Sequence, residues 1–335
     1  MSATPAISII TPTWNRRELL LQAMDSVQVQ DLPDWEHVIV DDGSTDGTAE
    51  LVADRASSDP RIRWIQRAGD KAGASVCRNI GWRAARASLI IFLDSDDLLD
   101  PDCLSLRVKA MTRNQDLAFS VFRTGVFKEA PGDLKRELSA EVVGDDLLQF
   151  LFFEIPWQTS ASVWRRPVLE ELDGFDEALP SWQDVDLHIR AIAGAFKYLR
   201  YRRIDHHMRW HWEDTKVSIM QRRSPDHLRA APDILKKFEI VVRKGPGMNW
   251  SRQRALCSLY FMVAEFWVQA GCAGEALRAW RMARARGLST GMLQRSGAVL
   301  LVLESLFGSR PLVMKIVHKW KGLMRLRTNA ELVSP

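Results

Sequence analysis

Residues 90–100 read IIFLDSDDLLD, and this stretch indicates the fold. Its four leading apolar residues are too few for a helix and fit a strand buried on both faces of a parallel sheet. Asp94, Asp96 and Asp97 follow where that strand should end, and ligands bind at the carboxyl ends of strands in open α/β sheets. Carboxylates this close repel unless a cation joins them, so the stretch predicts a Mg²⁺ or Mn²⁺ site beside phosphate oxygens. The alternative is that these acids cap a helix after Pro101.

The chain has 335 residues, of which 46% are hydrophobic and 26% charged, as expected for a globular protein with one large domain and an appendage. Its four cysteines have neither zinc-site spacing nor the density of a disulfide scaffold, which favours a reducing compartment. Strand-like residues begin by Ile7 without a basic flank and apolar core, so we expect no secretion signal and a cytoplasmic protein. No apolar stretch approaches the roughly 18 residues of a membrane span.

Charge is unevenly distributed, although the net charge is only +4. Residues 1–100 carry 10 Lys and Arg against 16 Asp and Glu, whereas residues 241–335 carry 15 against 4. The basic end indicates either a partner or a solvated surface. Near the C-terminus an apolar residue recurs about every four positions beside lysines and arginines, at Leu312, Ile316, Trp320 and Met324. This amphipathic pattern predicts a helix that either lies on an anionic membrane or packs on the catalytic domain or a second subunit.

Strand-like and helix-like segments alternate through the first hundred residues. Strands are expected at 6–11, 36–40, 62–66 and 89–93, and helices at 16–28, 48–56 and 76–87. Asn15 and Glu18 should cap the first of these helices. The alternation predicts an α/β fold with a mostly parallel sheet, right-handed crossovers and helices on both faces. Two later strands, at 117–126 and 159–164, should extend the sheet.

Polar residues follow three of the expected strands and should meet at one edge of the sheet. They are Pro12, Thr13 and Trp14 after the first strand, Asp41 and Asp42 after the second, and residues 94–97 after the fourth. The first turn has neither GxGxxG nor GxxxxGK[ST], which argues against a hydride-transfer enzyme or an ATPase. Asp42 could accept the N3–H of a uracil, Trp14 could stack on the base and Arg78 could meet a phosphate. The alternative for Arg78 is a helix-surface cation.

Four motifs together resemble glycosyltransferase family 2. They are TPTWN at 11–15, VDDGSTDGT at 40–48, AGASVCRNIG at 72–81 and FLDSDD at 92–97, in the family's usual order. LDGFDEALPSWQDVDLHIR at 172–190 resembles the family's late segment, so the resemblance covers about residues 5–220. It implies a GT-A fold and inverting transfer of a sugar from a nucleotide diphosphate donor, with a UDP-sugar expected, using Mn²⁺ or Mg²⁺. Two positions depart from the pattern: Trp14 stands where Tyr is usual, and Gln183 where Glu commonly precedes the catalytic Asp.

The resemblance also implies roles for individual residues. Asp96 would hold the metal, which stabilises the charge of the leaving diphosphate, and Asp94 would contact the ribose or the water shell of the metal. Pro12 and Ser95 would belong to the donor-nucleotide site. Asp184 would be the general base that takes the proton of the acceptor hydroxyl. Because it opens a predicted helix, Asp184 could instead be only an N-terminal cap.

Two further residues are assigned to the second half of this region. Trp182 is expected to contact the acceptor sugar, because aromatic planes pack on the C–H faces of sugar rings, although most tryptophans at such positions belong to the core. His211 is expected to complete the metal shell, as a late histidine does in some GT-A enzymes. The alternative is a structural histidine.

The resemblance implies a GT-A catalytic domain, which we expect over 1–244, with a nucleotide-binding half (1–115) and an acceptor half (116–244). A cluster of breaker residues after residue 244 predicts a boundary before a basic helical region over 245–335. The expected function is sugar transfer to a glycan or lipid-linked acceptor in surface polysaccharide or lipopolysaccharide biosynthesis. We expect no nucleic-acid partner, while peripheral contact with the inner face of the cell membrane and a homo-oligomer stay open. The alternatives are a catalytically silent GT-A scaffold and a nucleotidyltransferase, which the lack of a Gly-rich basic phosphate loop disfavours.

Overall fold

The computed structural model describes residues 4–138, 144–210, 225–307, 315–317 and 319–320. Its strands are β1 (Ile7–Thr13), β2 (Trp35–Asp41), β3 (Ile62–Gln66), β4 (Leu89–Phe92), β5 (Leu98–Leu99), β6 (Phe119–Phe127), β7 (Arg136–Glu137), β8 (Ser162–Arg165) and β9 (Tyr198–Arg209). Its helices are α1 (Arg17–Gln28), α2 (Thr48–Ser58), α3 (Ala74–Ala84), α4 (Cys103–Arg113), α5 (Asp146–Leu151), the 3₁₀ turn η1 (Thr159–Ala161), α6 (Arg166–Glu171), α7 (Gln183–Ala193), α8 (Pro225–Lys244), α9 (Trp250–Gln269), α10 (Ala273–Ala285) and α11 (Gly291–Phe307).

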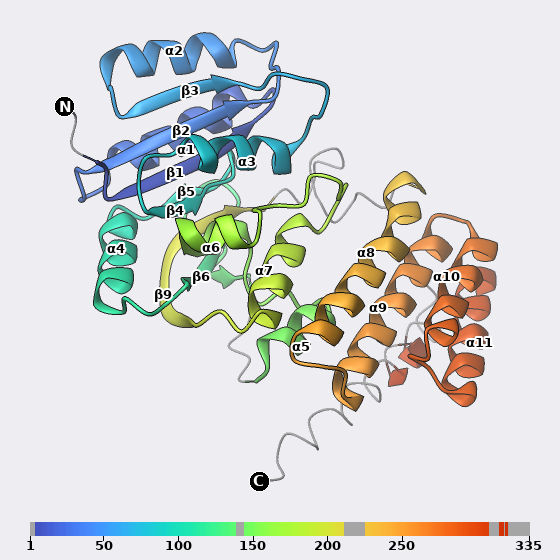
Figure 1. The fold of residues 1–335 in the computed structure, drawn as a ribbon. Coiled ribbons are helices and arrows are strands. Elements are labelled where there is room, and N and C mark those ends of the chain that lie inside the picture. Colours follow the sequence, from blue (N-terminus) through green and yellow to red (C-terminus); the bar gives the residue numbers. More distant parts are fainter. Residues whose placement is uncertain (1–3, 139–143, 211–224, 308–314, 318, 321–335) are drawn as a thin grey trace. The chain divides into compact units, whose positions relative to one another are not determined.

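Contacts divide the chain into two compact units. Unit 1 comprises Met1–Val143, Ile155–Ala178 and Trp182–Glu213, and unit 2 comprises Gly144–Glu154, Leu179–Ser181 and Asp214–Pro335. Unit 1 contains the sheet, and unit 2 contains α5 and α8–α11 (Figure 1). The predicted domain boundary at residue 244 stays a prediction; by contacts, α8 groups with α9 in unit 2.

Unit 1 is built on one mixed sheet with the strand order β3-β2-β1-β4-β8-β6-β9-β5 and β7 beside β6. The first four strands in this order are parallel, as the βα alternation predicted. β8 runs antiparallel to both β4 and β6, β9 is parallel to β6, and β5 pairs antiparallel with β9. Because β1, β2 and β4 are adjacent and parallel, their carboxyl ends lie at the same edge of the sheet.

Alternate residues of the central strands face opposite layers of helices. Ile9 and Ile91 lie in the core formed with α1, α2 and α4. Ile10 faces the other side, where α3 packs closely: a Cβ on Gly81 would lie 2.3 Å from Ile10 Cγ2 and 3.2 Å from Val40 Cγ2. Only glycine allows this approach, since real Cβ atoms do not come so near. The prediction of an α/β sheet with helices on both faces is confirmed (Figure 1).

The turn before α1 differs from the prediction. The N-cap residue of this helix is Arg16, whose side chain makes no cap hydrogen bond, so the expected capping box is wrong. Asp46 Oδ2 instead accepts the Arg17 N–H at 3.0 Å. Asn15 has φ 49° and instead contacts the turn after β2: its Oδ1 accepts the Thr45 N–H at 2.7 Å, and its N–H donates to Ser44 Oγ at 2.9 Å. These bonds fix the β1–α1 turn, which bears Trp14 and Arg16, against the β2–α2 turn.

Unit 2 has an aromatic centre between α9, α10 and α11. The Phe261 ring lies 5.3 Å from Trp280 and 4.5 Å from Trp320 between centroids, and Trp320 Nε1–H donates to Ser296 Oγ at 3.1 Å. Trp320 therefore packs within the C-terminal helices, whereas the sequence pattern predicted a stripe on a membrane, on the catalytic domain or on a second subunit. Ile316 is 44% exposed, while Leu312 and Met324 lie outside the described residues. Among the helices that are described, none is both long enough and apolar enough to cross a membrane.

Candidate active site

The acidic stretch forms the turn between β4 and β5, where β4 ends at Phe92 and β5 begins at Leu98. The following helix, α4, begins only at Cys103, and the side chain of its N-cap residue, Asp102, makes no cap hydrogen bond. The alternative in which these acids cap a helix is therefore wrong. They lie at the edge of the sheet that holds the ends of β1 and β2.

The predicted donor-site carboxylates Asp42 and Asp94 and the predicted metal ligand Asp96 each have an arginine partner from another element. The pairs are Arg16–Asp96 and Arg78–Asp94, both at 2.6 Å, and Arg67–Asp42. Arg78 is only 6% exposed, so its interpretation as a helix-surface cation is wrong. The sequence analysis missed Arg16 and Arg67, although Arg67 directly follows β3 and could have been found from that position.

Three buried polar atoms around Asp42 have no hydrogen-bond partner within the described residues: Thr13 Oγ1, Ser75 Oγ and Arg78 Nε. Asp42 joins their elements, because its N–H donates to the Thr13 carbonyl at 2.9 Å and its Oδ2 accepts the Gly73 N–H at 2.8 Å, just before α3. Buried polar groups are nearly always satisfied, so this edge is suited to a polar ligand.

The remaining predicted nucleotide-site residues differ in exposure. Trp14 is 61% exposed at the end of β1, so its ring is accessible for stacking. Pro12 is buried within β1 opposite Val40, and Ser95 is buried in the acidic turn.

Asp184 is the second residue of α7, and it lies in the electrostatic field of the donor-site residues. Burial raises its pKa; the charge of Arg78 opposes this shift, and that of Asp94 adds to it. A carboxylate whose pKa is raised toward neutrality is better matched to accepting a proton from a hydroxyl. Its Oδ1 also accepts the Val185 N–H at 2.9 Å. Asp184 therefore also makes a contact at the N-terminus of α7, as the helix-cap alternative expected.

Trp182 precedes α7 in the left-handed conformation, with φ 59°. Such a backbone is strained for a residue with a Cβ and persists only where its surroundings impose it. The loop before it is anchored to α3: Asn79 Nδ2 donates to the Phe175 carbonyl at 2.8 Å, and its Oδ1 accepts the Phe175 N–H at 2.9 Å. A Cβ on Gly174 would lie 2.4 Å from Asn79 Oδ1, so this contact also requires glycine.

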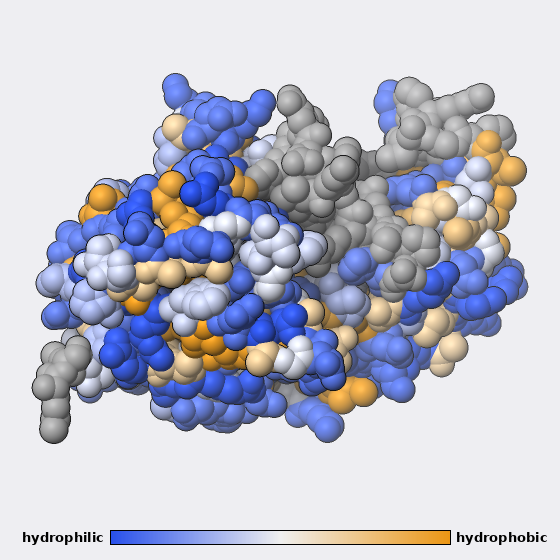
Figure 2. Space-filling view, turned by 90° about the horizontal axis from the view of Figure 1, so that it is seen from above, coloured by the Kyte–Doolittle hydropathy of each residue, from blue (hydrophilic) through white to orange (hydrophobic). Residues whose placement is uncertain are grey.

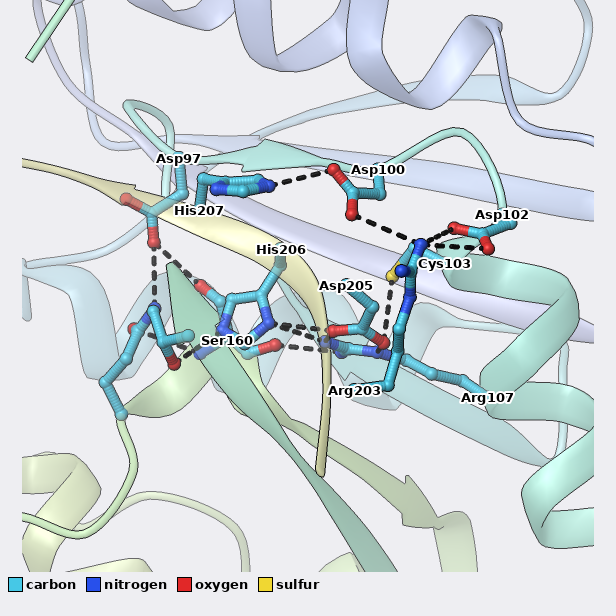
Figure 3. A network of polar contacts seen from close by, with 12 residues as sticks. Asp97, Asp100, Asp102, Cys103, Arg107, Ser160, Arg203, Asp205, His206 and His207 are labelled. Carbon is cyan, nitrogen blue, oxygen red and sulfur yellow. Dashed lines mark hydrogen bonds and ion pairs between the residues drawn. The ribbon is translucent and has the colours of Figure 1, made fainter. Parts of the chain in front are cut away.

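Asp97, the last acid of the turn, is an anchor. Its Oδ2 accepts hydrogen bonds from Gln158 Nε2 and Ser160 Oγ, both at 3.1 Å, and its Oδ1 accepts the Arg209 N–H at 3.2 Å. Burial raises the pKa of Asp97 well above its usual range, and the charges of Asp96 and Asp94 add to the shift. Figure 3 shows this carboxylate pointing at Ser160. Asp97 therefore fixes the turn that presents its two neighbours.

Behind Asp97 lies a buried charged cluster (Figure 3). Arg107 is fully buried; it donates to the Ser160 carbonyl and, through two nitrogens, to both Asp205 oxygens, each at 2.8 Å. Burial alone would raise the pKa of Asp205, but Arg107 outweighs it and lowers the pKa to about 2. His206 contacts Asp205 and Thr124 Oγ1, both at 2.9 Å, and burial lowers its pKa. This cluster joins α4, η1, β6 and β9 beneath the acidic turn.

A divalent cation fits the chemistry of this turn. His211, predicted to complete the metal shell, lies outside the described residues. In the portion of the chain that is described, no group of three His, Cys, Asp or Glu side chains could hold a metal. Mg²⁺ is often bound by only one or two carboxylates together with substrate phosphates and water. Asp96 and Asp94 can supply that partial set, provided Arg16 and Arg78 yield their places to the cation or turn toward the phosphates.

The fold is that of the GT-A glycosyltransferases. It is similar to TarS 1–349 of S. aureus in complex with UDP-GlcNAc, with a TM-score of 0.62 and 14% identity over 90% of this chain and 92% of that one. It is also similar to the mannosyltransferase PcManGT from Pyrobaculum calidifontis in complex with GDP-Man and Mn²⁺, with a TM-score of 0.55 and 19% identity over 98% and 87% of the two chains. At these identities the similarity concerns the fold.

Residues 8–172 match the family described as Glycosyl transferase family 2, and this part of the chain belongs to that family. The GalNAc(5)-diNAcBac-PP-undecaprenol beta-1,3-glucosyltransferase of Campylobacter jejuni is 32% identical over 142 residues, which is 42% of this chain and 45% of the relative. The chain spans less than half the length of several curated relatives that it matches. The predicted family and fold are confirmed, and the roles of the individual site residues stay predictions.

Proposed function

We propose that this protein is an inverting glycosyltransferase that moves a sugar from a nucleotide diphosphate donor, with UDP-sugars as the favoured class, to a glycan or lipid-linked acceptor. The observation that carries this proposal is the meeting of Asp42, Arg78, Asp94 and Asp96 at one edge of a parallel sheet, with Asp184 within the electrostatic reach of two of them. This combines donor recognition with a group that can accept a proton.

Donor binding would use the groups that lack partners or are accessible. The exposed Trp14 ring stacks on the base, and Asp42 accepts a base N–H. Arg78, whose Nε has no partner among the described atoms, donates to a phosphate. Complexes with UDP-GlcNAc and with GDP-Man among structures of the same fold support a nucleotide-sugar donor.

The metal would be Mn²⁺ or Mg²⁺, held by Asp96 with Asp94 beside it. When bound, it supplies positive charge for the oxygens of the leaving diphosphate. Asp97 and the Arg107 cluster keep the acidic turn in place, so little reorganisation is needed as charge develops.

Asp184 would act on the acceptor. As the acceptor oxygen forms its bond to the anomeric carbon, the bond from that carbon to the diphosphate breaks, and the hydroxyl proton passes to Asp184. Attack opposite the leaving group inverts the configuration. Trp182, the residue before α7, would pack on the acceptor sugar.

The process we propose is surface polysaccharide or lipopolysaccharide biosynthesis, on the cytoplasmic side of the cell membrane. The Campylobacter jejuni relative is named for transfer to an undecaprenol-linked acceptor, and this name supports a lipid-linked acceptor here. A peripheral location follows from that choice of acceptor.

The test is donor hydrolysis by the full chain across UDP-, GDP- and TDP-sugars with Mn²⁺, Mg²⁺ or chelator. We expect metal-dependent release of UDP from at least one UDP-sugar, and loss of that release in Asp96→Ala. A thermal shift with UDP and Mn²⁺ accompanies it, because a ligand at 100 times its Kd should add about 2.7 kcal/mol of stability. If no donor is hydrolysed and no nucleotide stabilises the protein, the chain is a scaffold and the proposal fails.

A further inference from the structure

Helix α11 of unit 2 presents an apolar stripe to the outside. Met292, Val299, Val302 and Leu306 are 84%, 57%, 42% and 70% exposed. Their spacing of seven, three and four residues places them on one side of the helix, over a length of about 21 Å. We call these four residues the α11 face. Figure 2 shows apolar surface gathered at the right-hand edge of the view, the side on which Figure 1 places α11.

The opposite side of α11 is fixed against α10, although it carries polar residues. Gln294 and Glu304 are 7% and 6% exposed. The Gln294 carbonyl accepts Trp280 Nε1–H at 2.9 Å, and a Cβ on Gly297 would lie 2.6 Å from the Trp280 ring. This contact allows no side chain at residue 297, so the helix cannot turn to bury the apolar stripe. Leu300 and Leu301, 6% and 1% exposed, are also buried on this side, so α11 already contributes apolar residues to the core. A second apolar stripe on its outer side indicates that the α11 face has a partner.

The surroundings of the α11 face are basic. Residues 273–320 contain eight Lys and Arg against two acids, Glu275 and Glu304. Glu275 pairs with Arg278 at 3.2 Å, and Glu304 is buried, so neither offers an unpaired negative charge on the surface. Two cations lie next to the stripe: the exposed Arg295 within it, and Arg284, whose Nη1 would lie 3.9 Å from a Cβ on Gly291. The partner should therefore combine apolar groups with negative charge.

We propose that the α11 face lies in the headgroup layer of an anionic lipid bilayer. An amphipathic helix with cations around its apolar side binds in this way, with apolar side chains at the acyl boundary and cations at the phosphates. This inference deepens the proposed function, because a lipid-linked acceptor would be presented at the same surface. It assigns the contact to α11, and not to a stripe through Trp320, which is packed inside unit 2.

The experiment is flotation of the full chain with vesicles of phosphatidylcholine alone or with 30% phosphatidylglycerol, at low and high salt. The test variant is Val299→Asp with Leu306→Asp. The matched control is Val29→Asp, which alters an apolar residue of similar exposure, 63%, in unit 1. We expect the wild type and the control to float with anionic vesicles and not with neutral ones, less so at high salt, and the double variant to lose at least tenfold in affinity.

Circular dichroism and UDP titration on the same preparations check that each variant is folded and report the donor site separately from vesicle binding. Failure of the wild type to float, or equal flotation of the double variant, would overturn the inference while leaving the donor chemistry standing. A wild-type dimer that the double variant converts to a monomer, without vesicle binding by either, would assign the α11 face to a second copy and also overturn it.

Discussion

Replacing Arg16 by Met should make the protein bind Mn²⁺ more tightly in the absence of nucleotide. Arg16 Nη1 lies 2.6 Å from Asp96 Oδ2, so guanidinium and metal compete for the same carboxylate. The side chains of Arg16 and Asp96 are 30% and 14% exposed, which places the pair between the surface and the interior. Surface ion pairs contribute roughly 0–1 kcal/mol, and burial increases the cost of disrupting them.

We therefore take about 1–1.4 kcal/mol as the free energy needed to break the Arg16–Asp96 ion pair when Mn²⁺ binds. The Arg16→Met substitution should therefore lower the Kd for Mn²⁺ by about 5- to 10-fold, since about 1.4 kcal/mol corresponds to a tenfold change in Kd. The loss of one positive charge beside the metal acts in the same direction. With nucleotide present the sign should reverse, because the displaced guanidinium can then bind the diphosphate. UDP should bind more weakly to Arg16→Met than to the wild type at saturating Mn²⁺.

The assay is the electron paramagnetic resonance signal of free Mn²⁺ in a titration, followed by calorimetric titration of UDP. Arg17→Met is the matched control, because the neighbouring Arg17 pairs with Glu18 on the surface and not with the acidic turn. Asp96→Ala should lose the site and so identifies the signal. If Arg16→Met and Arg17→Met bind Mn²⁺ equally, Arg16 does not compete for the metal site and the reasoning is refuted.

Two further variants test the base and the core. Asp184→Asn keeps an oxygen for the Val185 N–H but cannot take a proton, so kcat should fall by roughly 10² to 10⁴ with UDP affinity unchanged; lost affinity with normal turnover would place Asp184 in the donor site. Burial lowers the pKa of His37 to about 3. As the pH falls below about 6.5, the unfolded chain therefore binds a proton at this residue while the folded chain does not, and the free energy of unfolding decreases. Between pH 7 and 5 the wild type should lose about 2 kcal/mol more stability in urea unfolding than His37→Gln; equal losses would contradict this.

The parallel half of the sheet was predictable because its signals are local. β3 lies at the expected residues 62–66, and β2 (Trp35–Asp41) extends the expected strand by one residue at each end. Each is a run of strand-forming residues bounded by turn residues. β2 is also buried along its whole length, as its apolar run indicates. The clustering of acids at one edge then follows from parallel order alone.

The partners of those acids could not be predicted, because they depend on tertiary contacts. Arg16 and Asp96 are 80 positions apart, and no spacing rule joins them. β5 has only two residues, Leu98 and Leu99, which is too short for any periodicity; the structure pairs them with β9. The same holds for Trp320, whose sequence spacing fits an exposed stripe as well as an internal contact.

The order in which the chain emerges during synthesis limits when this site can form. The acidic turn is fastened by the N–H of Arg209, 112 positions after Asp97, and the neighbouring β5 has β9 as its partner. At about 5 to 20 residues per second, translation needs about 6 to 22 s to supply that strand after the turn has been made. Until then the three acids have no partner strand on that side and no buried arginine cluster beneath them. A nascent chain would therefore acquire its parallel strands early and the contacts that anchor its acidic turn late, because contacts between residues far apart in the sequence form last.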